Sequence, residues 1–62
     1  MQLLAPPEVA DILGIKVSTL TQWRWAGRGP SWHRLGGGAG KGAVRYSIAD
    51  LQAYIAASRQ VT

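Results

Sequence analysis

The sequence predicts a mainly α-helical fold with one small β-hairpin, formed by a single domain of 62 residues. Prolines, a serine and glycines mark the starts and stops of three short helical segments. Two runs with alternating side chains flank the glycine-rich stretch GGGAGKG, as strands flank a hairpin connection. The chain has no cysteine and one histidine, so we expect neither a disulfide nor a metal ion to reinforce the domain. Its few large side chains have to form the core.

The first predicted helix lies within LLAPPEVADILG, from the two prolines to the residue before the glycine. Proline suits the first helical positions, where no amide donor is needed, and glycine commonly follows a helix end. Val9, Ile12 and Leu13 are spaced to form one apolar stripe. A helix of about two turns does not persist alone in water, so this stripe is expected to pack on a neighbour.

The segment VSTLTQWRWAG predicts the second helix, closed by Gly27. It lacks the regular alternation and the enrichment in β-branched residues that indicate a strand. In a helix, Trp23 and Trp25 lie roughly 200° apart, so we expect Trp23 to anchor the core and Trp25 to face outward. Two alternatives stay open for Trp25: a cover over the base of the hairpin, or contact with a sugar-phosphate backbone.

The runs SWHRL and AVRYS predict the two strands of the hairpin. Because side chains alternate along a strand, Leu35, Val44 and Tyr46 are expected to face inward. Arg34 and Arg45 are expected to face outward. The connection GGGAGKG supplies residues that tolerate positive φ angles. The alternative to a DNA-contacting wing tip is a surface loop with no function of its own.

The segment SIADLQAYIAASR predicts a third helix over about residues 47–59. Ser47 and Asp50 resemble a capping box at its start. Ile48, Leu51 and Ile55 form its apolar stripe.

The order of these elements predicts a winged helix-turn-helix of three short helices plus a wing. Two helices joined by a tight turn occupy about residues 6–27, and the hairpin, or wing, occupies about residues 31–46. Such a fold places its second helix in the major groove of DNA. No repeat or linker divides residues 1–62, so one DNA-binding domain is expected.

The distribution of charge also favours a polyanionic partner. Residues 12–49 contain six of the seven basic residues of the chain and none of its three acidic residues. Carboxylates interspersed among these cations would cancel the attraction to phosphate, and they are missing. The charge distribution therefore indicates a nucleic acid, and the predicted helix-turn-helix makes double-stranded DNA the expected partner.

Two groups of residues are predicted to contact DNA. The recognition helix presents short, amide and apolar side chains suited to base edges and thymine methyl groups, with an arginine and a tryptophan at its margins: Val17, Ser18, Thr21, Gln22, Arg24 and Trp25. Cations beside this helix and in the wing are expected to bind the backbone and the adjacent minor groove: Lys16, Arg28, Arg34, Lys41 and Arg45.

Catalysis and cofactor binding are not predicted. The glycines around Lys41 fit neither a Walker loop nor a dinucleotide fingerprint, and the chain offers too few nucleophiles and bases for an active site. No metal site is expected from one histidine. The chain also lacks an apolar run of about 20 residues and a secretion signal, so we expect no membrane partner.

The segments PPEVADILGIKVSTLTQWRWAGRGP, VRY and SIADLQAYI together resemble the small winged helix-turn-helix domains of the MerR-like superfamily, in particular phage excisionases, or recombination directionality factors. The resemblance covers about residues 4–58. It implies an architectural protein that binds adjacent DNA sites, bends DNA and directs an integrase toward prophage excision, in the cytoplasm of a bacterial host. It assigns the recognition helix to Ser18–Trp25 and the wing to Trp32–Arg45.

The chain lacks the long dimerisation helix of MerR regulators, so we expect a monomer that gains affinity from neighbouring copies on DNA. Two alternative functions stay open. The first is a small transcriptional regulator of the AlpA or MerR type. The second is a basic adaptor that binds RNA or an acidic protein; the deep major groove of RNA excludes a helix, so a preference for duplex RNA would favour this second alternative.

Overall fold

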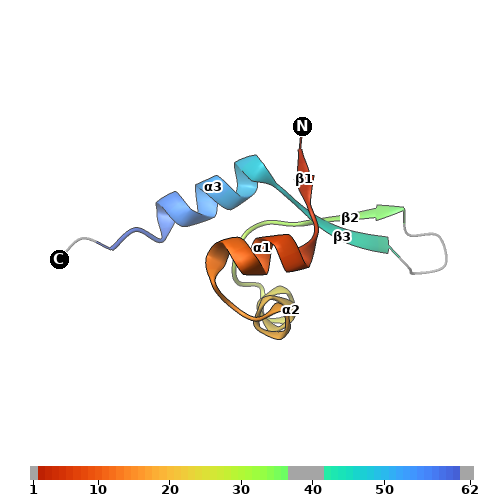
Figure 1. Ribbon diagram of the computed structural model, residues 1–62, viewed down its shortest axis with the longest axis horizontal. Helices are drawn as coiled ribbons and strands as arrows, with labels where there is room; N and C mark the ends of the chain where they lie inside the picture. The colour runs from red at the N-terminus through yellow and green to blue at the C-terminus, as the bar shows by residue number, and fades with distance from the viewer. Residues whose placement is uncertain (1, 37–41, 61–62) are drawn as a thin grey trace.

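The computed structural model describes residues 2–36 and 42–60, in which three helices accompany a small antiparallel sheet (Figure 1). The elements in chain order are β1 (Leu3–Leu4), α1 (Pro6–Leu13), α2 (Val17–Ala26), β2 (His33–Gly36), β3 (Gly42–Ser47) and α3 (Ile48–Ala57). The strand order is β1-β3-β2, so β3 is the central strand. The predicted winged helix-turn-helix is confirmed. Strand β1 was not predicted, because two residues are too short to show alternation.

The helix boundaries follow the local signals in the sequence. In α1, the Glu8 carboxylate accepts a hydrogen bond from the Ala5 amide at 3.0 Å. Gly14 then ends the helix with φ of +70°, a left-handed conformation that favours glycine. In α3, the Ser47 hydroxyl accepts a hydrogen bond from the Asp50 amide at 3.0 Å, which is one of the two bonds of the predicted capping box and makes Ser47 the N-cap. The short link between α1 and α2 is the tight turn expected of a helix-turn-helix.

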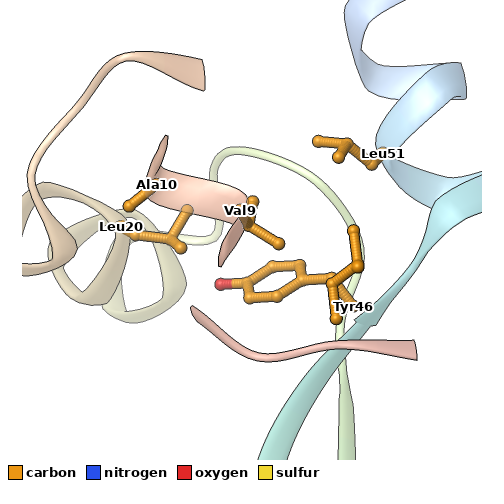
Figure 2. Packing of buried hydrophobic residues seen from close by; sticks show 6 residues of the cluster. Val9, Ala10, Leu20, Tyr46 and Leu51 are labelled. Carbon is orange, nitrogen blue, oxygen red and sulfur yellow. The ribbon is translucent and has the colours of Figure 1, made fainter. Parts of the chain in front are cut away.

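The core is a small cluster contributed by both ends of the chain and by the two helices between them: Leu4, Val9, Ala10, Leu20, Tyr46 and Leu51. Figure 2 shows Val9 and Leu20 directed toward the ring of Tyr46, which projects from β3. Val9, Leu20 and Tyr46 are completely buried. This cluster joins the sheet to the helix-turn-helix.

Two residues predicted for the core lie largely in solvent. Ile12 is 56% exposed, because α1 turns the face of Val9 and Ala10 toward Tyr46 and Ile12 lies to the side of that face. Ile55 is 47% exposed. Helix α3 packs mainly on β3 and runs outward from the sheet, so only its N-terminal part, with Leu51, reaches the cluster (Figure 1).

The hairpin register corrects the prediction for the wing. Leu35 lies opposite Ala43, and Arg34 lies opposite Val44. Directly paired residues share a face of a sheet, so Arg34 shares the face of Val44, whereas Leu35 shares the face of Arg45. The expectations that Leu35 faces inward with Val44, and that Arg34 and Arg45 face the same way, are therefore wrong. A shift of one residue in register exchanges the faces, and the long glycine-rich connection leaves the register open in the sequence.

Trp23 packs at the margin of the core rather than at its centre. Its half-buried indole lies 5.9 Å from the Tyr54 ring, measured between centroids. Gly29, with φ of +82°, passes so close that a Cβ there would lie 2.6 Å from Cε3 of the indole. Trp23 therefore packs against the core as predicted, but only partly buried. The fully buried residue of α2 is Leu20.

Leu20→Ala is expected to lower the free energy of unfolding by about 2–5 kcal/mol, because it leaves a cavity at a completely buried position. Leu35→Ala deletes the same atoms from a side chain that is 42% exposed. Its cost should stay below about 1 kcal/mol. Urea denaturation followed by circular dichroism measures both losses, and equal losses would contradict this core and register.

Candidate nucleic-acid interface

One face of α2 is free of core contacts. The helical spacing brings Ser18, Gln22 and Trp25 to this face, on the far side from Leu20, with Val17 and Thr21 at its margin. All of them are exposed except Thr21, which is half-buried. This face carries the side chains that the sequence predicts for base contacts.

Trp25 is the most exposed large side chain on this face, at 88%. A side chain covering the base of the hairpin would be mostly buried, so that alternative for Trp25 is excluded. The prediction that Trp25 faces outward is confirmed.

Arg24 turns from α2 toward the wing. Its guanidinium donates from Nη1 to the Tyr46 hydroxyl at 2.9 Å and from Nη2 to the Thr21 hydroxyl at 3.3 Å. The Thr21 hydroxyl in turn donates to the Val17 carbonyl at 3.1 Å. Arg24 and Thr21, both predicted to contact DNA, are therefore hydrogen-bonded to each other. The bond to Tyr46 links α2 to the central strand.

Trp32 connects Arg24 to the wing. Its ring centroid lies 5.9 Å from Cζ of Arg24 and 5.3 Å from Cζ of Arg34, both within the range of a cation–π interaction. The structure therefore brings a helix arginine and a wing arginine to the same indole. Trp32 was missing from the predicted contact residues, although its spacing of two residues from Arg34 was the signal that an extended chain would bring them to one face.

Arg24, Trp25, Trp32 and Arg34 together line an open cleft of about 250 Å³ between α2 and the wing. We call it the Arg–Trp cleft. It contains two guanidinium groups, two indole rings and no carboxylate. Its chemistry therefore suits a ligand that is anionic and partly apolar.

The other predicted cations lie outside this cleft. Lys16 and Arg28 are exposed beyond the two ends of α2. Arg45 lies on the opposite face of the wing from Arg34, and its Nη1 donates to the Val44 carbonyl at 2.7 Å. Lys41 lies outside the described residues. The structure thus brings Arg24 and Arg34 together and separates Arg45 from them.

The arginines of this surface are not paired with carboxylates of the described residues. Within residues 2–36 and 42–60, the one close contact between a basic side chain and a carboxylate joins His33 Nε2 to Asp50 Oδ2 at 3.3 Å, between the wing and the start of α3. No arginine in these ranges pairs with a carboxylate. The potential of these arginines is therefore available to an external anion.

Other kinds of site are not evident in the part of the chain that the structure describes. No three histidine or acidic side chains in this part gather as a metal site would require. No helix among these residues has both the length and the apolar character needed to cross a bilayer.

Fold and surface define a small DNA-binding domain of the winged helix-turn-helix type. Residues 3–59 match the family described as the helix-turn-helix domain, and the chain belongs to this family. It is a DNA-binding family that includes excisionase-like proteins. No curated protein and no solved structure matches the chain.

Tyr46→Phe is expected to lower the free energy of unfolding by about 1–2 kcal/mol, because it deletes the acceptor of a hydrogen bond from a charged group. Tyr54→Phe is the matched control, because the Tyr54 hydroxyl has no hydrogen-bond partner among the described residues. Its effect should be within about 0.5 kcal/mol of zero. Thermal denaturation of both variants checks this, and similar losses would contradict the role of the Arg24 contact.

Proposed function

We propose that this domain binds specific sequences of double-stranded DNA, with α2 in the major groove and the wing against the adjacent minor groove. One observation carries the proposal. The exposed face of α2 lies beside a cleft with two arginines and no carboxylate. A duplex is the partner that offers base edges to a helix and phosphates to the flanking cations.

The exposure of the α2 side chains supports distinct roles for them. Gln22 is exposed and carries an amide that can pair bidentately with adenine. Ser18 can bond either donor or acceptor edges, and Val17 can pack on a thymine methyl group. The Thr21 hydroxyl already donates its proton to the Val17 carbonyl, so it has no proton left to donate to a base. Thr21 therefore contributes to recognition in two ways: its hydroxyl oxygen orients Arg24, and the same oxygen can accept one further hydrogen bond from a base.

Backbone contacts are assigned to the cations around these groups. Lys16 and Arg28 flank the two ends of α2, where the strands bordering the major groove would pass. Arg34 and Arg45 lie on opposite faces of the wing, so a wing in the minor groove would offer one arginine to each wall. Lys41 completes the set as a further wing cation in the sequence.

The role that we propose for this binding is architectural. We infer an excisionase-like protein that occupies adjacent sites through neighbouring copies, bends the DNA and directs an integrase toward excision. Membership of a family that includes excisionase-like proteins supports it, as does the sequence resemblance across about residues 4–58. A small transcriptional regulator of the same fold is the second candidate, because the family match fits it equally well.

Gln22→Ala is expected to reduce discrimination by about 1–3 kcal/mol at one or two base positions, because it removes a base contact. Arg28→Ala is the control: it should weaken binding to all sequences alike and reduce the salt slope by about 1. With about five cations on phosphates, the wild-type slope of log affinity against log salt should be about −4.5. Anisotropy titrations with a selected duplex and its single-base variants measure these quantities. A flat salt response, or a preference for duplex RNA, would contradict DNA binding in the major groove.

The architectural role predicts protection of several adjacent sites in the DNA that flanks the gene, with a bend that grows as successive copies bind. Footprinting and circular-permutation mobility assays measure both effects. Addition of the protein to an integrase that acts on the same DNA should also raise the yield of excised product. A single unbent site with an effect on transcription alone would favour the regulator instead.

A further inference from the structure

The Arg–Trp cleft lies where a DNA strand would have to pass. Arg24 and Trp25 belong to the last turns of α2, whereas Trp32 and Arg34 belong to the start of the wing. A helix in the major groove and a wing in the adjacent minor groove are separated by one sugar-phosphate backbone. The cleft is the hollow between these two elements.

The two arginines of the cleft carry positive charge that the domain does not neutralise. Their Cζ atoms lie 5.9 and 5.3 Å from the same indole centroid, so two like charges are held around one ring. Arg24 uses one N–H of each terminal nitrogen on Tyr46 and Thr21. Arg34 makes no hydrogen bond to the described residues, so its planar fork is free for a phosphate.

The wing is shaped to hold Arg34 in this position. Gly42 lies diagonally across from Arg34 in the hairpin, and a Cβ at this glycine would overlap Cγ of Arg34 and lie 2.8 Å from its Cδ. The stem of Arg34 therefore packs over the glycine, and its Cζ lies 5.3 Å from the Trp32 ring centroid. A larger residue at position 42 would displace the guanidinium from the ring.

Charge alone does not account for Trp25. The indole of Trp25 is 88% exposed at the rim of the cleft, so it gains little from folding and offers an apolar face to a bound ligand. A deoxyribose-phosphate unit has both parts, an anion for the guanidinium groups and an apolar sugar face for the indole. A cleft of about 250 Å³ that is open to solvent suits a chain passing through it better than an enclosed small molecule.

We propose that the Arg–Trp cleft clasps one deoxyribose-phosphate unit of the DNA backbone, with its phosphate on Arg34 and Arg24 and its sugar against Trp25. The proposal rests on the proposed DNA-binding function and assigns a specific unit of that ligand to specific residues. In the proposed complex, the DNA strand between the two grooves then fixes the position of the domain along the duplex. Trp32 serves as the platform that keeps the two guanidinium groups in place.

A double-mutant cycle tests this assignment on the intact chain bound to a selected duplex. Trp25→Ala and Arg34→Ala should each weaken binding about tenfold, and the double variant should lose little more, because both side chains hold the same unit. The control pair is Trp25→Ala with Arg28→Ala, whose losses should multiply. Circular dichroism melts should match the wild type, because Trp25 and Arg34 are exposed.

Duplexes with a single neutral methylphosphonate identify the phosphate. At one position the neutral linkage should weaken the wild type about tenfold and should weaken Arg34→Ala clearly less, because only Arg24 then faces that linkage. Multiplicative losses for Trp25 and Arg34, or no such position, would overturn the proposal while binding itself persists. An acidic peptide that binds through these residues, with DNA affinity unchanged in both variants, would also overturn it. Absence of any duplex binding by the wild type would instead refute the proposed function.

Discussion

The hydrogen bond between Arg24 and the Tyr46 hydroxyl, together with the packing of Leu20, holds α2 against the strand of the wing, the two elements that we propose to face DNA. Tyr46 belongs to β3, the strand that pairs with both β1 and β2, and its ring is completely buried among residues of α1 and α2. Only its hydroxyl reaches the edge of the core, where the Arg24 guanidinium meets it at 2.9 Å. Arg24 then lies beside Trp32, at the entrance to the wing. One phenol therefore connects the core, α2 and the hairpin, and this connection holds Arg24 beside the other residues of the Arg–Trp cleft.

The small size of the domain explains why so much of this arrangement depends on few contacts. A chain of this length buries only about 60% of its unfolded surface, and here the buried cluster consists of Leu4, Val9, Ala10, Leu20, Tyr46 and Leu51. Side chains such as Trp23 and Trp32 pack at its margin and remain partly open to solvent. Trp25 makes no contribution to the core at all, since it is 88% exposed. In a molecule with so little apolar surface to bury, the position of Trp25 is better explained by a ligand than by folding.

Local signals in the sequence predict most of the helix boundaries, but they do not predict which side chains share a face. Prolines, Ser47 and the glycines that end the helices are short-range features, so they predict helix boundaries well. Ile12 and Ile55 were misassigned because a two- or three-turn helix shows an apolar stripe without revealing which part of it meets the core. Leu35 and Arg34 were exchanged because the hairpin register depends on pairing across a connection that the sequence leaves unconstrained. The spacing of Trp32 and Arg34 places them on one face, but that this face meets Arg24 of α2 could be recognised only from the structure.

The lack of carboxylates in the cleft is a compromise between folding and binding. An acidic side chain beside Arg24 or Arg34 would offset the repulsion between two guanidinium groups and would strengthen the contact between α2 and the wing. It would also repel the phosphate that we propose to bind in this cleft. The domain instead stabilises Arg24 with neutral acceptors, the hydroxyls of Tyr46 and Thr21, and with the face of Trp32. These partners orient the guanidinium without cancelling its charge, so the helix and the wing are held together by groups that still attract the same backbone.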